Sequence, residues 1–162
     1  MIPYNGKLMI YDLIEQVDAI KPNSYTVAEK LAWVSELDGN IYHDLKEWYD
    51  NPEEINEAWF SARLMGNGLK LPYDEHEDYT PTVTPYVYKD GTQIFVKVSA
   101  ILLAPFPYDA MYVTWLSAKI DYANGDIAKY NNAKVMFDEQ YGSFMNWVNR
   151  RLLHKKTRID YL

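Results

Sequence analysis

The sequence predicts a mainly α-helical protein: a small bundle of about four principal helices with one β-hairpin between the second and third long helices. In four long stretches apolar residues recur every three or four positions, the period of an amphipathic helix. Between the second and third stretches the period changes to two around an Asp-Gly pair, which is typical of a hairpin. With 162 residues and no repeat or long linker, we expect a single domain, 1–162.

The four helices are expected at about residues 9–20, 27–50, 110–123 and 126–152. Lys21-Pro22 ends the first, because the residue before proline is pushed out of the helical region. Thr26 and Glu29 form a capping box for the second, in which the Glu29 side chain would return to the Thr26 amide. Asn51-Pro52 ends that helix.

A short corner is expected to join the third and fourth helices. Asp109 is a good N-cap residue for the third helix. Asn124 and Gly125 would close it through a left-handed glycine, and Asp126 would cap the fourth. The two helices then fold back as an αα-hairpin. Little polar face remains on the third helix, so we expect it to be central or at an interface.

The hairpin is expected at about residues 83–98, with Asp90-Gly91 as its two-residue turn and both turn residues at positive φ. A two-stranded ribbon is marginally stable alone, so it should lie on the helices or on another chain. Before it, residues 50–82 are rich in Asp and Glu. We interpret that segment as an exposed acidic connection with one short helix.

Composition excludes several classes of protein. The chain has no Cys, so disulfides and thiolate chemistry are absent. A net charge of −7 argues against a surface that grips nucleic acid, although DNA can slide past an acidic wall. Fifteen Tyr and five Trp favour interfaces with an apolar centre and a wet rim. The apolar runs are too short to span a bilayer, and the N-terminus does not resemble a signal peptide.

No motif for a catalytic nucleophile, a P-loop or a dinucleotide is present, so we expect no enzyme, no cofactor and no metal site. The acidic run Asp74–Asp78 could hold a hard cation, but it lacks the ligand spacing of an EF-hand and is better interpreted as a solvated loop. His43 beside Asp44 is better interpreted as a surface histidine than as an acid–base pair.

Two stretches carry a resemblance to a known family. They are "LIEQVDAIKPNSYTVAEKLAWVSELDGNIY" (13–42) and "LLAPFPYDAMYVTWLSAKIDYANGDIAKYNNAKVMFDEQYGSFMNWVNR" (102–150). The most specific features are Pro107-Tyr108-Asp109, the "DYANGD" corner, and Tyr130-Asn131-Asn132 followed by Phe137 and Trp147. Together they resemble the small head–tail connector proteins of tailed bacteriophages and prophages of Gram-positive bacteria. About half of the chain is covered, and residues 50–81 do not carry the likeness.

The resemblance implies a virion structural protein: an adaptor ring in the phage neck, often of twelve copies, around the DNA channel. Such rings contact a portal protein on one side and a stopper or tail-completion protein on the other, while DNA passes without specific binding. The C-terminal arm, 153–162, and the end of the last helix are then the candidate portal contact, through Arg150, Arg151, Lys155, Lys156 and Arg158. The hairpin tip is a candidate subunit or stopper contact, through Lys89, Asp90, Gly91 and Thr92.

We therefore expect a non-enzymatic adaptor in the virion neck, present in the host bacterial cytoplasm during assembly and independent of membranes. A tail-completion or stopper component is the alternative within structural proteins. Two other classes remain open: a small acidic enzyme that uses Asp74–Asp78 with His43, and a regulatory or DNA-mimic module.

Overall fold

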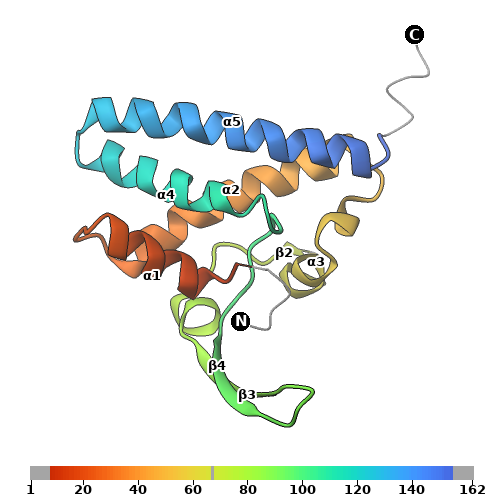
Figure 1. Ribbon diagram of the computed structural model, residues 1–162. Coiled ribbons are helices and arrows are strands. Elements are labelled where there is room, and N and C mark those ends of the chain that lie inside the picture. The colour runs from red at the N-terminus through yellow and green to blue at the C-terminus, as the bar shows by residue number, and fades with distance from the viewer. Residues whose placement is uncertain (1–7, 67, 155–162) are drawn as a thin grey trace.

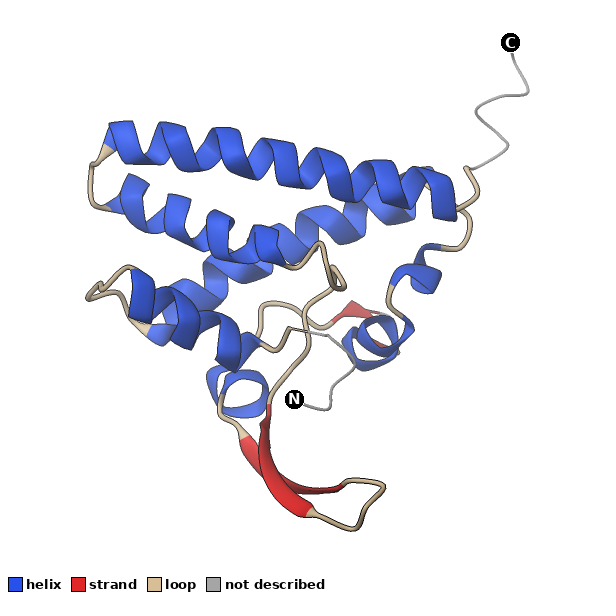
Figure 2. Cartoon of the chain, viewed as in Figure 1, coloured by secondary structure: helices blue, strands red, loops and turns tan. Residues whose placement is uncertain are grey.

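The computed structural model describes residues 8–66 and 68–154, which are mainly helical (Figure 1). The elements are α1 (Ile10–Ile20), α2 (Val27–Trp48), η1 (Pro52–Ile55), α3 (Glu57–Arg63), β1 (Leu64–Met65), β2 (Gly68–Leu69), η2 (Glu75–Tyr79), β3 (Thr82–Val87), β4 (Gln93–Val98), α4 (Ala110–Ala123) and α5 (Ile127–Arg151). Figure 2 shows the long helices stacked on one side of the molecule and the hairpin extending from the other side. The predicted fold class, a mainly α bundle with one long hairpin before its last two helices, is confirmed.

The capping box starts α2 as predicted, with one difference. Thr26 Oγ1 accepts a hydrogen bond from the Glu29 amide at 3.1 Å, but the Glu29 carboxylate accepts from the Thr26 hydroxyl rather than from its amide. The helix ends at Trp48, two residues before the predicted end. Tyr49 is extended (φ −127°, ψ 151°) because it leaves the helix to form a β-bridge with His154.

The third long helix, α4, lies at the centre of the bundle, as its apolar sequence indicates. Met111, Tyr112, Leu116 and Ile120 are fully buried, and α4 contacts α1, α2 and α5. Asp109 stands at the predicted N-cap position, but its side chain makes no capping hydrogen bond to the helix. Its backbone is itself helical (φ −67°, ψ −15°), because the preceding turn already brings the chain in with helical angles.

The corner between α4 and α5 has the predicted geometry. Gly125 is left-handed (φ 77°), and its amide donates to Tyr122 O at 3.0 Å, while the Asp126 amide donates to Asp121 O at 2.9 Å. These two bonds form a Schellman motif, which satisfies the last carbonyls of α4. The Asp126 side chain then accepts from the Lys129 amide at 3.2 Å and caps α5.

Replacing Gly125 with alanine is expected to lower the free energy of unfolding by about 1 kcal/mol. The loss comes from backbone strain alone, because φ at this position is +77° and a Cβ would meet no atom within 4 Å. Gly142→Ala is the matched control: this glycine lies inside α5 with the same open space, so alanine should stabilise by about 0.5–1 kcal/mol. Urea unfolding measures both, and equal shifts for the two variants would contradict the left-handed corner.

Residues 50–82 do not form the exposed acidic connection that the sequence suggested. They contain η1, α3, the short β1–β2 pair and η2, and they bury large side chains against α2 and the segment before α4. Trp59 is fully buried and Phe60 and Tyr73 nearly so. The sequence hides this burial for two reasons. Most of the acidic residues lie on the outside of the segment, and its apolar residues have no regular spacing.

The hairpin pairs Thr82 with Val98 through Val87 with Gln93, close to the predicted bounds. Its turn differs from the prediction. Residues 89–91 form a three-residue loop, in which the Gly91 amide donates to Tyr88 O at 2.9 Å and Gly91 takes φ 90°. This is a turn followed by a left-handed glycine, the second commonest hairpin connection, so Gly91 supplies the positive φ after the turn rather than within a two-residue turn.

Candidate interaction surfaces

Among the described residues, the hairpin arm, Thr82–Val98, is fixed to the body at its base. Ser99 Oγ accepts from the Tyr11 amide at 3.0 Å, and the Ala100 amide donates to Asp78 O at 2.9 Å. The Lys97 ammonium lies 5.4 Å from the centre of the Tyr11 ring. Beyond these contacts the two strands extend away from the helices (Figure 1).

One side of the arm is exposed and largely apolar. The strand register puts Val83, Pro85 and Val87 on the same side as Phe95, together with Gln93 and Lys97. Val83, Val87 and Phe95 are 64, 60 and 68% exposed. The four apolar side chains, called the arm face below, are Val83, Pro85, Val87 and Phe95. Exposed apolar side chains gathered on one face of a projecting element are typical of a contact with another chain.

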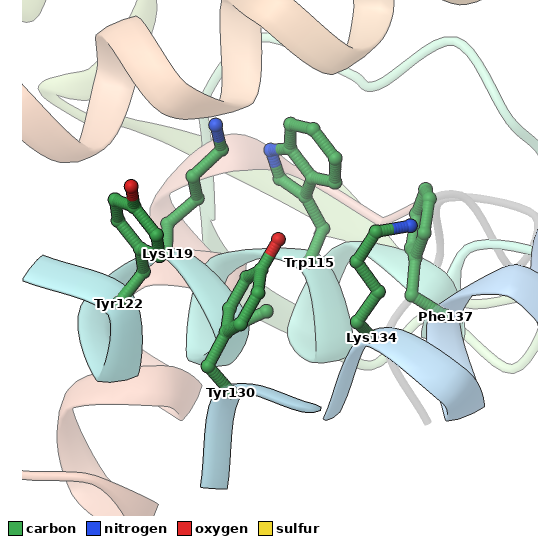
Figure 3. Close-up of a pocket in the computed structure, with 7 residues that line it drawn as sticks. Trp115, Lys119, Tyr122, Tyr130, Lys134 and Phe137 are labelled. Carbon is green, nitrogen blue, oxygen red and sulfur yellow. The ribbon is translucent and has the colours of Figure 1, made fainter. Parts of the chain in front are cut away.

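A groove lined by aromatic side chains runs between α2, α4 and α5. It consists of two adjoining hollows of about 330 and 340 Å³ that share Trp115 and Phe137. Figure 3 shows the first hollow, where α4 contributes Trp115 and Tyr122 and α5 contributes Tyr130 and Phe137. The second hollow continues beside α2 and Tyr141. The aromatic groove is defined by its rings: Trp115, Tyr122, Tyr130, Phe137 and Tyr141.

Charged groups of both signs border the aromatic groove. Lys119 lies 4.7 Å from the centre of the Trp115 ring and 3.2 Å from Glu36. Lys134 is 3.1 Å from Asp138. At the far end Asp44 accepts a hydrogen bond from the Tyr141 hydroxyl at 2.6 Å. Burial is the main cause that raises the pKa of Tyr141, and the hydrogen bond to this carboxylate is the second. With an apolar floor and a charged rim, the groove suits a protein segment with an apolar face.

The predicted portal contact lies at the end of α5 and beyond it. Arg150 and Arg151 are exposed in the last turn, and the Arg151 guanidinium lies 5.7 Å from the centre of the Trp147 ring. Basic side chains here also complement the helix dipole. Leu152 is buried and ties the end of α5 to the body. Lys155, Lys156 and Arg158 lie outside the described residues.

The predicted hairpin-tip contact, Lys89 to Thr92, is exposed at the outer end of the arm. The Asp90 carboxylate accepts from the Thr92 amide at 2.9 Å, and this bond, with that of the Thr92 hydroxyl, lowers the pKa of Asp90. The tip is therefore a structured turn with an ionised carboxylate. The sequence pointed to this tip, but it did not single out the arm face.

A buried polar network centres on Asp38 of α2. Tyr73 Oη donates to its carboxylate at 2.5 Å, the Tyr112 hydroxyl donates to the other oxygen, and the Leu103 amide donates at 3.3 Å. Trp59 Nε1 donates in turn to Tyr73 Oη, and the Ala104 amide to Tyr112 Oη, both at 2.8 Å. The carboxylate therefore accepts three hydrogen bonds and donates none, which is the arrangement that an ionised acid requires.

Burial raises the pKa of Asp38 to about 6, against the opposing effect of hydrogen bonds from Tyr112, Tyr73 and the Leu103 amide. The carboxylate is 0% exposed and joins α2, the segment before η2, the segment before α4, and α4 itself. Its hydrogen-bond donors come from three other parts of the chain. We therefore assign it a structural role, as the polar junction of the core.

Two of the carboxylates proposed for an acidic enzyme, Asp74 and Asp78, are engaged by protein partners. Asp74 accepts from the His76 and Glu77 amides at 2.9 and 2.7 Å and caps η2, and these bonds lower its pKa. Asp78 forms a buried ion pair with Arg63 at 2.7 Å. His43 packs edge-on to Tyr42. Within residues 8–66 and 68–154, no group of three or more His, Asp or Glu is arranged to hold a metal ion.

Comparison of the chain with protein-family models, with curated proteins and with solved structures gives no significant match. In the part of the chain that the structure describes, every helix is too short or too polar to cross a lipid bilayer.

Proposed function

We propose that this protein is a structural adaptor of a tailed-phage neck, which forms a ring under the portal and links the capsid to the tail around the DNA channel. The observation that carries the proposal is the arm face: an exposed apolar side of a hairpin that leaves the helical body (Figure 1). A protein that acts alone gains nothing from such a surface, whereas a repeated subunit uses it to contact its neighbour.

Two further features support this proposal. The aromatic groove is a second apolar surface, so that each subunit has two different adhesive sites, as a head-to-tail ring requires. The net charge of −7 lets DNA pass through a channel without being held by it. The sequence resemblance to phage connectors agrees with both features, and it supplies the portal as the partner.

The test is assembly with the portal protein encoded in the same phage genome. The full-length chain is mixed with purified portal and viewed by negative-stain electron microscopy, and a ring of copies stacked on the portal is expected. No ring and no portal complex over a range of salt and protein concentrations would overturn the proposal. A monomer that instead captures a DNA-binding protein would favour the regulatory alternative.

Reversal of the charge at the end of α5 tests which surface meets the portal. Arg150→Glu is expected to weaken portal binding at least about tenfold, because it puts an acid where the resemblance predicts a basic contact. Lys129→Glu is the matched control: it makes the same charge change on an exposed residue in the first turn of α5 and should leave affinity nearly unchanged. Equal affinities for both variants, measured by biolayer interferometry, would exclude this end of α5 as the contact.

A further inference from the structure

The arm and the α4–α5 pair, which lines the aromatic groove, lie on opposite sides of the molecule (Figure 1). In Figure 1 the arm extends from the side of the bundle that faces away from the α4–α5 pair, and the groove runs along that pair. The base of the arm is fixed by bonds to α1 and to Asp78, so the arm of one copy cannot fold back into its own groove. Within residues 8–66 and 68–154, an arm that fills the groove must therefore come from another copy.

The dimensions of the two surfaces agree. Strands of six residues, as in β3 and β4, are about 20 Å long. Along α5 the groove extends from Tyr130 to Tyr141, which is about 16 Å at the rise of an α-helix. The arm's 17 residues, 82–98, also come close to the roughly 20–30 residues that each side of a standard interface contributes.

Their charges are complementary. The arm carries Lys89, Lys97 and Asp90, one more base than acid, although the whole chain has a net charge of −7. The groove rim, made up of Lys119, Lys134, Glu36, Asp44 and Asp138, has one more acid than base. Two copies of so acidic a chain repel each other overall, and contact between the basic arm and the acidic rim reduces that repulsion.

The arm is built to dock by its face rather than by strand addition. Pro85 lies in the middle of β3 and pairs with Phe95, so the outer edge of that strand lacks a donor. Lys97 puts a charge on the other strand. Both residues are devices by which natural edge strands avoid pairing with another strand. The apolar side chains of the arm face are then the adhesive part.

From these observations we infer that the arm face of one copy docks in the aromatic groove of the next copy. The contact joins two different surfaces, so it propagates head to tail and closes into a ring where the rotation allows. Phe95, 68% exposed in the single chain, is the side chain that enters between the aromatic rings. The inference rests on the proposed ring and names the two surfaces that build it.

The natural absence of cysteine allows a clean cross-linking test on the full-length chain. Gln93→Cys puts a thiol on the same side of the arm as Phe95, and Lys134→Cys puts one on the groove rim. The double variant is treated with a short bismaleimide, both alone over a concentration series and bound to the portal. A covalent ladder of three or more copies is expected, because each molecule then links to the next one.

The matched control combines Gln93→Cys with Val135→Cys. Val135 is one residue further along α5, 61% exposed, and points about 100° away from the groove rim. We expect at least about fivefold less ladder from this pair. Phe95→Asp added to the first pair should remove the ladder.

The outcomes separate this inference from the proposed function. Rings on the portal with equal ladders from both cysteine pairs, or with none, would overturn the arm-in-groove contact and leave the adaptor proposal standing. Absence of rings, portal complexes and ladders together would overturn both. A ladder specific to the groove pair, lost with Phe95→Asp, supports the contact.

Discussion

Replacing Asp38 with alanine is expected to lower the free energy of unfolding by about 3–5 kcal/mol, a large part of the stability of a domain of this size. The hydroxyls of Tyr73 and Tyr112 and the amide of Leu103 all lose their acceptor inside the core. Each unsatisfied buried donor costs about 1–3 kcal/mol. The variant also removes a buried carboxylate charge, but this gain offsets only part of the cost. Urea unfolding followed by tryptophan fluorescence measures the loss.

Asp44→Ala is the control for this prediction. Asp44 lies on the same helix and also accepts from a tyrosine hydroxyl, that of Tyr141, but it lines an open groove where water can replace it. Its loss should cost no more than about 1 kcal/mol. If the two alanine variants were equally stable, Asp38 would not be the polar junction of the core.

The same carboxylate makes stability depend on pH in a defined direction. Burial raises the pKa of Asp38 from 3.8 to about 6, so the folded state binds its proton more tightly than the unfolded state does. The tighter proton binding stabilises the folded state below about pH 4, and this stabilisation is lost as the pH rises through 6. The contribution of Asp38 to the free energy of unfolding falls by about 3 kcal/mol over that range. Asp38→Asn cannot titrate, so its stability relative to the natural protein should rise by that amount over this window. A constant difference would contradict the raised pKa.

Arg63→Met is expected to destabilise the protein by about 3–5 kcal/mol. Arg63 and Asp78 form a buried ion pair, with side chains 6 and 7% exposed, and the guanidinium also lies 5.0 Å from the centre of the Tyr73 ring. Removing one partner of a buried pair leaves an uncompensated charge in the core. Differential scanning calorimetry at neutral pH measures the change.

The double variant Arg63→Met/Asp78→Asn separates the charge from the packing. Asparagine keeps an acceptor for the Asp74 amide, which donates to Asp78 at 2.6 Å, but it carries no charge. The double variant should therefore be more stable than Arg63→Met alone. Lys134→Met, which breaks the exposed pair with Asp138, should cost only about 0.3–0.5 kcal/mol. A similar loss of stability for Lys134→Met and Arg63→Met would show that burial does not strengthen the dependence of Asp78 on its partner.

Local chemistry made much of the fold predictable. Thr26 and Asp126 cap helices, and Gly125 takes a positive φ, because each feature depends on only a few neighbouring residues. The hairpin is predictable from the alternation around Asp90-Gly91, although the length of its turn is not. Asp109 has the predicted N-cap position but no side-chain cap, because such a cap depends on the backbone angles of the incoming turn, and the residue type does not reveal these angles.

The sequence by itself determined the four long helices, the corner, the hairpin and the absence of cysteine chemistry, because hydrophobic period and capping act over one or two turns. Only the tertiary structure decided that Asp38 meets Tyr73 and Tyr112, that Arg63 is buried against Asp78, and that Trp115 and Phe137 line one groove. These partners are far apart in the sequence or lie in a segment without a regular period. Their meeting depends on how whole elements pack, and the same packing leaves the arm face without a partner within the described chain.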